Sequence, residues 1–589
     1  MKTIKLSIGF LLVITSVLIV YWGVLSNDFL VTWDDDAYVL ENPHLNINST
    51  QDVAELFTIT YEGNYHPISM LSLALDHAIW GEQSQGYHLT NILLHIANAL
   101  LVFWLALLLI KHQLSAFFVA LLFALHPMHV ESVAWVSERK DVLFLFFLLS
   151  GLITYLYSQS RKHNRLWYLM TIVLFTLSVL SKPSAIVFPV LLLLLDGWQK
   201  EEWRWRLLVN KIPFVLVALT VAGITVFAQG SADAISDLSD YSLWQRVQLV
   251  SHSWMTYAYK FFVPINQSGF YGYPPYDVSF PIGFQVAPFV VLLVGVGALL
   301  RYRKYKHPVI GLAFFTVALL PVLQIIPVGS AMMAERYTYL PYLGLNLGVM
   351  MLLKQFLAQQ KQLAVSFHAC IVVLVLLFGI KTVDRTAIWQ SDETFWTDVL
   401  QKDPKTQMAH FGLGNYYYMN GDYEACIQQY KQLLEYYPND LQGNGFLGFL
   451  YDKIDQPLEA IKHLDKVVYL DSLDFESRHI RGVSLLKIGL PEDALADFDH
   501  CISYDSDSPH HYIMRADAHL ALGQLSLAVA DWQQAIELDT EDAKAYYNLG
   551  LYYYETQDFE NAKEFFISAA VINPEKDKYK KMAALFEEG

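Results

Sequence analysis

The stretch LGNYYYMNGDYEACIQQYKQLLEYYP (413–438) decides the fold of the C-terminal part of the chain, because the chain repeats it. Its counterpart LGLYYYETQDFENAKEFFISAAVINP (549–574) begins four units of 34 residues later. Each unit carries a first small residue, at Gly414, Gly448, Gly482, Ala516 and Gly550, and a second one twelve residues later, at Cys426, Ala460, Ala494, Ala528 and Ala562. Small residues at both places let two helices of one unit approach closely, so the pattern predicts a stack of helix pairs.

A period of 34 residues with this pattern is the signature of the tetratricopeptide repeat, or TPR. Five units fill residues 404–573, with Pro404, Pro438 and Pro574 marking the frame. The tail PEKDKYKKMAALFEEG (574–589) is predicted to be a capping helix with a polar outer face. Because TPR arrays present binding surfaces, any chemistry is expected in the rest of the chain.

Residues 1–383 have a different character, because they contain long apolar runs. The chain is 54% hydrophobic, with a mean hydropathy of +0.30. About eleven runs are long enough to be membrane spans, some of them short: 5–25, 92–110, 114–130, 141–158, 166–181, 184–196, 209–228, 286–300, 308–327, 338–353 and 364–381. The sequence therefore predicts an all-α protein: a polytopic membrane helix bundle (1–383), a linker helix (384–403) and a TPR α-solenoid.

Net charge and cysteine content exclude two classes of protein. The formal net charge is −17, with a conspicuous acidic excess in the repeats, which argues against nucleic acid as a partner. The three cysteines provide no disulfide framework.

The basic segments predict the orientation in the membrane. Cytoplasmic loops carry an excess of Lys and Arg. Every cluster falls on one side if the N-terminus is cytoplasmic: 2–5, 111, 161–165, 199–206, 301–307 and 354–361. An odd number of spans then places the TPR array outside the cytoplasm. With its compact loops, the chain is expected to be an integral protein of a bacterial inner membrane, with a periplasmic TPR domain.

An acidic triplet follows the first run directly. Asp34, Asp35 and Asp36 repel one another, so a raised pKa is expected unless a cation offsets the charge. One interpretation is a general base beside a second carboxylate that orients a substrate or a metal. The alternative is a solvated acidic loop. The position after a span, between Trp33 and Tyr38, favours a functional role.

Histidines and a carboxylate cluster in the turn after the third run. His126, His129 and Glu131 lie within six residues and could bind a metal or donate to phosphate, although their spacing fits no standard zinc motif. Together with Asp34 and Asp35, the two histidines are the candidate ligands of a divalent cation. The alternative is that each histidine is a hydrogen-bonded structural residue.

Cations also gather on the side predicted to face outward, against the usual bias. They are Arg139, Lys140, Lys182, Lys260 and Arg336. An anionic lipid headgroup would explain them. The alternative is ion pairing with Glu138, Asp141 and Glu335. A lipid-phosphate donor fits this layout: a carboxylate deprotonates an acceptor hydroxyl, and the cations stabilise the leaving phosphate.

Several segments together resemble the transmembrane-and-TPR (TMTC-like) O-mannosyltransferases, which are GT-C-type glycosyltransferases related to the protein O-mannosyltransferases. The matching segments are WDDDAYVLENPHL (33–45), YHPISMLSLALDHAIWG (65–81), GYHLTNILLHIANALLV (86–102), FALHPMHVESVAWVSERKDVL (123–143), LSKPSAIVFPVLLLLLDGW (180–198), PVLQIIPVGSAMMAERYTYLP (321–341) and WQSDETFWTDVL (389–400). The TPR units follow, as in the family, so the resemblance covers nearly the whole chain.

The resemblance implies a polyprenyl-phosphate-linked sugar donor and transfer to Ser or Thr of a protein. The acidic pair of the family maps onto Asp34 and Asp35 as catalytic residues, and the additional Asp36 leaves open which carboxylate is the base. The family often has Arg where this chain has His66. The candidate substrate-binding residues are then His66, His126, His129, Glu131, Arg139, Lys140, Lys182, Lys260, Glu335, Arg336 and Tyr337.

Three hypotheses of different classes follow. The first is a membrane glycosyltransferase whose TPR array recruits the acceptor protein, with a glycan or lipid acceptor as a variant. The second is a non-enzymatic membrane-anchored TPR scaffold for envelope assembly. The third is a transporter of lipid-linked sugars. Transporters place ionisable groups near the midplane of the membrane, and an anchor needs no charged loops between spans, so the outer cluster favours the transferase.

Overall fold

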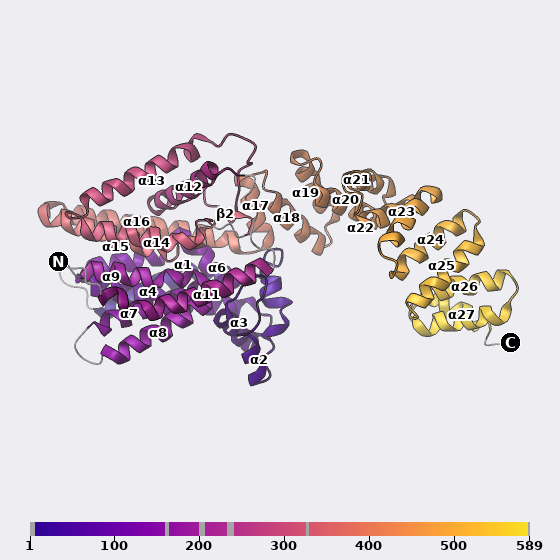
Figure 1. Cartoon of the computed structure of the whole chain (residues 1–589), viewed down its shortest axis with the longest axis horizontal. Helices are drawn as coiled ribbons and strands as arrows, with labels where there is room; N and C mark the ends of the chain where they lie inside the picture. The colour runs from indigo at the N-terminus through magenta and orange to yellow at the C-terminus, as the bar shows by residue number, and fades with distance from the viewer. Residues whose placement is uncertain (1–5, 160–163, 200–205, 232–240, 326–328, 587–589) are drawn as a thin grey trace. The chain divides into compact units, whose positions relative to one another are not determined.

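The chain folds as two compact units, Met1–Gly412 and Leu413–Gly589 (Figure 1). The computed structural model describes residues 6–159, 164–199, 206–231, 241–325 and 329–586. The basic segments 2–5, 161–165 and 199–206, which were used to predict the orientation, lie wholly or partly outside the described residues.

Apolar helices build the first unit. The helices that correspond to the predicted runs are α1 (Leu6–Tyr21), α4 (Ser84–Ile110), α5 (Gln113–Ala124), α6 (Val130–Ala134), α7 (Arg139–Ser158), α8 (Asn164–Ser181), α9 (Phe188–Gln199), α11 (Ile212–Ser231), α13 (Ile282–Arg301), α14 (Lys306–Leu319), α15 (Pro341–Gln359) and α16 (Ala364–Thr386). The helices between or after them are α2 (Thr50–Glu55), α3 (Pro67–Trp80), α10 (Arg206–Val209), α12 (Leu243–Phe262) and α17 (Asp392–Lys402).

The expected number of eleven spans is not confirmed. Within the described ranges, seven helices are long and apolar enough to cross a membrane, or eight if a bent pair counts as one span. In that pair, a 54° bend separates Gln113–Ala124 from Pro127–Ala134. Pro183–Gln199 and Lys306–Val322 are apolar but shorter. Within the described residues each apolar run thus contains a helix, but several of these helices are too short or too polar to count as spans.

The spans differ in how much of their surface is buried. Val136–Ser158, which contains α7, is the most buried of the seven, and Ile282–Arg301 is the least. In Figure 1, α13 accordingly lies at the edge of the bundle. Because lipid is as apolar as these side chains, an exposed apolar helix is stable in a membrane. Helix α7 therefore forms the centre of the unit and carries the charged residues of the site at its N-terminal end.

Glycines bring α14 and α15 into backbone contact. A Cβ added at Gly311 would lie 2.5 Å from the carbonyl oxygen of Gly344. A Cβ at Gly344 would lie 2.7 Å from the carbonyl oxygen of Gly311. Small residues allow this approach, which is how helices associate in lipid. The crossing holds α15 in place, and the loop before α15 carries Arg336.

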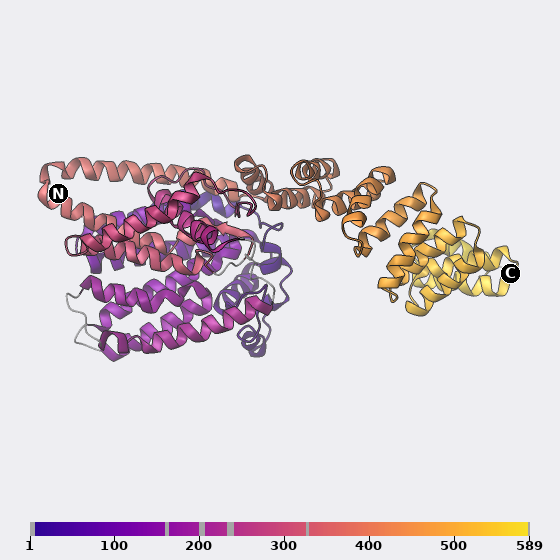
Figure 2. The same ribbon diagram turned by 45° about the horizontal axis from the view of Figure 1, so that its top comes forward.

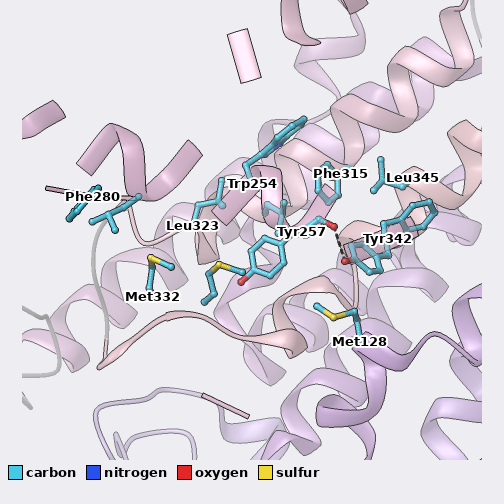
Figure 3. Close-up of a cluster of buried hydrophobic side chains, with 13 residues drawn as sticks. Met128, Trp254, Tyr257, Phe280, Phe315, Leu323, Met332, Tyr342 and Leu345 are labelled. Atoms are coloured by element: carbon cyan, nitrogen blue, oxygen red, sulfur yellow. Dashed lines mark hydrogen bonds between the residues drawn. The ribbon is translucent and has the colours of Figure 1, made fainter. Parts of the chain in front are cut away.

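A buried cluster anchors α12 to the bundle (Figure 3). Tyr257 of α12 packs with Phe315 of α14 and Tyr342 of α15. Its carbonyl accepts a hydrogen bond from the Tyr342 hydroxyl at 2.8 Å, and its own hydroxyl bonds the backbone of Ala334. Ala334 follows β2 (Ala331–Met333), which pairs antiparallel with β1 (Tyr271–Gly272). The cluster therefore fixes the start of the loop that contains Glu335 and Arg336.

Helix pairs build the second unit, and Figure 2 shows them following one another in an orange-to-yellow series. After α18 (Gln407–Met419), which crosses the boundary between the units, come α19 (Tyr423–Tyr436), α20 (Leu441–Lys453), α21 (Pro457–Leu470), α22 (Phe475–Lys487), α23 (Pro491–Tyr504), α24 (Pro509–Ala521), α25 (Leu525–Leu538), α26 (Ala543–Glu555), α27 (Phe559–Ile572) and α28 (Asp577–Ala584).

The small residues of the repeat lie where the two helices of a pair meet. A Cβ at Gly448 would lie 2.4 Å from the Leu464 side chain. Added Cβ atoms at the equivalent glycines would meet Tyr430, Phe498 or Phe566, each four residues beyond the second small position. The predicted reason for the small residues is therefore confirmed, since a larger side chain would separate the pair.

Ion pairs repeat with the same period of 34 residues. The Arg481 guanidinium bonds both carboxylate oxygens of Asp497, at 2.8 and 2.6 Å. Arg515 bonds Asp531 in the same way, at 2.9 and 2.7 Å. A bidentate pair fixes orientation as well as distance. At the end of the array, Tyr579 of α28 is buried against Ala543 and Ala569, so α28 covers the apolar surface of the last repeat.

Candidate functional site

The acidic triplet lies in the segment after α1 and beside the start of α7. Asp35 is 1% exposed, whereas Asp34 and Asp36 are partly exposed. Asp36 accepts a hydrogen bond from the backbone of Ala37 at 2.7 Å, and burial raises its pKa. The three carboxylates therefore have different surroundings although they are adjacent in sequence.

Asp35 is bonded through both of its carboxylate oxygens. One oxygen accepts from the backbone N–H of Leu30 at 2.9 Å. The other accepts from the Ser137 backbone N–H at 2.9 Å and also from the Ser137 hydroxyl. Burial raises the pKa of Asp35 to about 7, although these donors oppose the shift. Asp35 therefore ties the acidic segment to the turn before α7.

The Asp34 carboxylate forms no hydrogen bond or ion pair with the described residues. Burial raises its pKa above the ordinary value, while the positive charges of Lys140 and Arg336 act in the opposite direction. A carboxylate that is accessible, has a raised pKa and lies near cations has the properties of a general base. Of the two predicted catalytic carboxylates, Asp34 is the one with a free functional group.

Three cations surround one buried carboxylate. Glu138, which is 1% exposed, lies 3.4 Å from the Lys140 amine, 3.1 Å from the Lys182 amine and 3.0 Å from Nε of Arg336. We refer to Lys140, Lys182 and Arg336 as the cation cluster. They come from α7, the turn between α8 and α9, and the loop before α15, so the fold brings together three segments that are distant in sequence.

Two further carboxylates orient Arg336 and Lys182 of the cation cluster. Glu131 bonds the Arg336 guanidinium and also accepts from the Arg336 backbone N–H at 3.0 Å. Asp141 accepts from the Lys182 amine at 2.5 Å. These carboxylates raise the pKa of Lys182 and of Arg336 against the effect of burial. Both cations are therefore charged at neutral pH and held in fixed directions.

Aromatic and neutral polar side chains line the same region. Lys140 lies 5.0 Å from the centre of the Tyr38 ring, and the His66 ring lies 5.5 Å from that ring. Burial and nearby Lys140 lower the pKa of His66 to about 3, so His66 is neutral. The Arg336 guanidinium lies 5.3 Å from the Trp135 ring and 5.0 Å from that of Tyr337.

Arg139 lies apart from the cation cluster although it is adjacent to Lys140. Its guanidinium is fully buried and pairs with Asp76 at 2.6 Å. It also donates to Asn91, to the Ser72 hydroxyl and to the Tyr87 carbonyl. These bonds connect α7 with α3 and α4.

The structure gives the two predicted metal-binding histidines backbone partners. His126 accepts from the backbone N–H of Met128 and bonds the Phe261 carbonyl at 3.1 Å. His129 bonds the Phe123 carbonyl at 2.8 Å. Among the described residues, no group of three or more His, Cys, Asp or Glu could hold a metal ion. The proposed set of Asp34, Asp35, His126 and His129 is therefore not brought together as a ligand set.

Lys260 and Glu335 belong to a second polar group. Glu335 accepts from the Tyr271 hydroxyl at 3.0 Å and from the Gln267 amide at 3.1 Å, and it pairs with Arg385 at 3.4 Å. Lys260 donates to Tyr271 at 2.6 Å, and burial lowers its pKa to about 8. This group adjoins the cation cluster through the peptide bond between Glu335 and Arg336.

Sequence reasoning did not assign roles to Glu138 and Ser137. Glu138 was predicted only as a possible ion-pair partner of the outward-facing cations, and Ser137 was assigned no role. The signal was present in the dense charges of WVSERKD (135–141). A turn that supplies two carboxylates, two cations and a hydroxyl next to a span is unusual for an apolar bundle, and this density of polar groups predicts the centre of a site.

Comparisons with known proteins confirm the resemblance found in the sequence. Models of the tetratricopeptide repeat match residues 407–440 and 543–576, and a further TPR repeat model matches 516–557. Protein O-mannosyl-transferase F38B6.6 of Caenorhabditis elegans is 23% identical over 462 residues, which are 73% of this chain and 63% of that protein. Protein O-mannosyl-transferase TMTC3 of Mus musculus is 22% identical over 497 residues, which are 76% of this chain and 53% of that protein.

A shorter match is closer in sequence. Protein O-mannosyl-transferase TMTC2 of Homo sapiens is 39% identical over 114 residues, which are 18% of this chain and 14% of that protein. A crystal structure of MamA protein is similar to 30% of this chain over 97% of its own length, with 24% identity and a TM-score of 0.28. The chain therefore has homologues among the protein O-mannosyl-transferases, and it spans between half and two thirds of the length of the first two of these relatives.

Proposed function

We propose that this chain is a membrane glycosyltransferase that moves a sugar from a polyprenyl-phosphate-linked donor to Ser or Thr hydroxyls of exported proteins. One observation carries the proposal: the unbonded Asp34 carboxylate lies within the electrostatic reach of Lys140 and Arg336. A base and an anion-binding group side by side are what a transfer from a phosphate leaving group requires. The similarity to protein O-mannosyl-transferases supports the same class of reaction.

The donor phosphate would bind at the cation cluster. Lys140, Lys182 and Arg336 offer one guanidinium and two ammonium groups, and Arg–phosphate contacts are among the strongest charge-assisted hydrogen bonds. The phosphate carries a lipid, so it is expected at a membrane boundary with the prenyl chain between spans. Glu131 and Asp141 keep Arg336 and Lys182 in place before the donor arrives. This lowers the conformational entropy that these two side chains lose when the donor binds.

The reaction then needs a single displacement at the anomeric carbon. The acceptor hydroxyl oxygen forms a bond to the sugar carbon while the bond from that carbon to the phosphate oxygen breaks. Asp34 takes the hydroxyl proton, and the cation cluster stabilises the negative charge that grows on the phosphate. A single displacement inverts the configuration at the anomeric carbon.

The neighbouring side chains would shape the sugar pocket. Tyr337 and Trp135 present ring faces beside Arg336, and neutral His66 can exchange hydrogen bonds with hydroxyl groups without adding charge. Asp35 would hold the Asp34 segment in position and take no part in proton transfer.

The TPR array would recruit the acceptor. Arrays of this kind bind extended peptides or helices on their concave surface. In the proposed orientation the N-terminus is cytoplasmic, and the site and the repeats face the periplasm of a bacterial inner membrane. This arrangement would present exported proteins to Asp34 after they cross the membrane.

The test compares two carboxylates of the acidic triplet, Asp34 and Asp36. Wild type, Asp34→Asn and Asp36→Asn are expressed in a strain that lacks the gene, and envelope proteins are examined by intact mass. We expect a hexose-sized adduct with wild type and with Asp36→Asn, and its loss with Asp34→Asn at equal protein level. Because general-base catalysis contributes about 10²–10⁴-fold, the purified Asp34→Asn protein should lose at least a hundredfold in rate.

Two results would reject the proposal. Transfer by Asp34→Asn at the wild-type rate would remove Asp34 as the base. If wild type adds no sugar relative to the empty strain, the membrane-anchored scaffold becomes the better hypothesis. An adduct on a glycan or a lipid, with none on protein, would retain the reaction but change the acceptor.

A further inference from the structure

The start of helix α17, which leads to the TPR array, binds the acidic segment of the site. Asp392 is 3% exposed. Its carboxylate oxygens accept from the backbone N–H groups of Val31 at 3.1 Å and of Thr32 at 3.0 Å, and also from the Thr32 hydroxyl. The backbone N–H of Asp28 donates to the carbonyl of Gln390 at 2.9 Å. A distant part of the chain therefore satisfies the backbone immediately before Asp34.

Aromatic packing reinforces this attachment. The Trp396 indole N–H donates to the Thr32 hydroxyl at 2.7 Å, so that hydroxyl bridges Asp392 and Trp396. The Trp33 ring lies 5.0 Å from the Trp396 ring and 6.1 Å from the Phe395 ring. Both rings of α17 are fully buried. The residue next to Asp34 is thus enclosed by side chains of α17.

The packing behind these rings has no spare room. A Cβ added at Gly269 would lie 2.2 Å from the Phe395 ring. A Cβ added at Gly412, in α18, would lie 2.1 Å from the Trp396 ring. Close-packed interiors transmit displacements instead of absorbing them. A shift of α17 would therefore move Trp33 and the backbone beside it.

Asp34 depends on such anchors because its own carboxylate has no bond among the described residues. The backbone on one side of Asp34 is held by Asp392, through Val31 and Thr32. On the other side, Asp35 is held by Leu30 and Ser137. Asp392 therefore holds the backbone before Asp34, and the bonds of Asp35 hold the backbone after it. Together they restrict the direction of the Asp34 side chain.

We propose that Asp392 is a positioning residue of this transferase: it fixes the segment 31–34 so that the Asp34 carboxylate faces the cation cluster. The inference rests on the proposed function, and it adds the linker helix to the site. Asp392 touches neither reacting group. It acts only through the backbone of Val31 and Thr32.

Asp392 is not needed to begin its own helix. Ser391 caps α17: its hydroxyl accepts from the Thr394 backbone N–H, and the Thr394 side chain accepts in return from the Ser391 backbone N–H. The two functions are therefore carried by different side chains. Ser391→Ala weakens the start of the same helix, because loss of an N-cap is destabilising, but it removes no bond to the acidic segment.

The first measurement is amide hydrogen exchange of the full-length protein in detergent micelles, which does not depend on activity. Wild type, Asp392→Asn and Ser391→Ala are compared over peptides that cover residues 28–36. In Asp392→Asn, an NH₂ group replaces one of the two oxygens that accept from the backbone N–H groups of Val31 and Thr32. One of these N–H groups then loses its acceptor. We expect exchange in this segment to become at least tenfold faster in Asp392→Asn and to stay within twofold of wild type in Ser391→Ala.

The second measurement is steady-state transfer from polyprenyl-phosphate mannose to a Ser/Thr peptide by the same preparations, normalised to folded protein. In Asp392→Asn we expect kcat to fall at least tenfold, while the donor KM stays within twofold, because the cation cluster lies on other elements. Thr32→Val, which removes only the bridging hydroxyl, is expected to lower kcat several-fold. It serves as the second variant if Asp392→Asn does not fold.

The outcomes separate the two ideas. Faster exchange together with a lower kcat, in Asp392→Asn but not in Ser391→Ala, supports the positioning role. Faster exchange with normal kcat, unchanged exchange, or equal effects of Ser391→Ala would each overturn it. If wild type transfers no sugar, the proposed function fails and the positioning role falls with it, while the exchange data still show whether the anchor exists.

Discussion

Replacement of Asp35 tests whether its carboxylate stabilises the fold or takes part in the reaction. Its two oxygens accept three hydrogen bonds, from the Leu30 backbone and from the Ser137 backbone and hydroxyl. Asp35→Ala leaves three buried donors without partners, at about 1–3 kcal/mol each. We therefore expect the free energy of unfolding to fall by at least about 3 kcal/mol, a large effect for a single substitution.

Asp35→Asn should cost less, for a reason visible in the geometry. The amide keeps one carbonyl oxygen, which can still accept from both Ser137 groups. Its NH₂ group then faces the Leu30 N–H, so this N–H loses its acceptor and two donors oppose each other. An unsatisfied buried donor costs about 1–3 kcal/mol, and we expect about 2 kcal/mol for Asp35→Asn.

The assay is unfolding of the purified protein in mixed micelles, titrated with a denaturing detergent and followed by tryptophan fluorescence. Transfer rates are measured on the same samples per folded molecule. Asp36→Asn is the control, since Asp36 is partly exposed and should change stability by no more than about 0.5 kcal/mol. The reasoning is refuted if Asp35→Asn keeps wild-type stability but abolishes transfer, because Asp35 would then act in the chemistry.

Two further substitutions test the packing of charge and of helices. Glu138→Gln removes the carboxylate shared by three cations, and breaking a buried ion pair costs about 3–5 kcal/mol; thermal unfolding in detergent checks this, and an unchanged midpoint would show that the cations do not need it. Gly344→Val forces α14 and α15 apart and should cost about 1–3 kcal/mol in the same assay. Gly295→Ala, on α13 where nothing lies within 4 Å, should be neutral or stabilising and is the matched control.

The repeat half of the fold could be predicted from sequence because its cause is local. The 34-residue period places small residues where two adjacent helices touch, and the contact of Gly448 with Leu464 follows directly. The number of spans could not be predicted in this way. A run of apolar letters does not show that Pro127 follows a bend of 54°, or that a run forms a helix too short to cross a membrane.

Roles within the candidate site were harder to predict because they depend on contacts between distant residues. Asp35 is distinguished from Asp34 by Ser137, which lies 102 positions away. Arg139 and Lys140 are adjacent, but successive residues of a helix point about 100° apart. Lys140 therefore joins the cation cluster while Arg139 pairs with Asp76. The sequence indicated which segments meet, but not which side chain of each segment faces the others.

The cation cluster links the strength of the proposed base to the departure of the proposed leaving group. Burial raises the pKa of Asp34, and the positive charges of Lys140 and Arg336 oppose that rise. A donor phosphate bound to the same cations would offset part of their charge. As the bond to the sugar breaks, the phosphate gains negative charge. This charge further offsets the positive charge of Lys140 and Arg336, so these cations stabilise the ionised Asp34 carboxylate less. The proton affinity of Asp34 would therefore rise at the moment when the acceptor hydroxyl releases its proton.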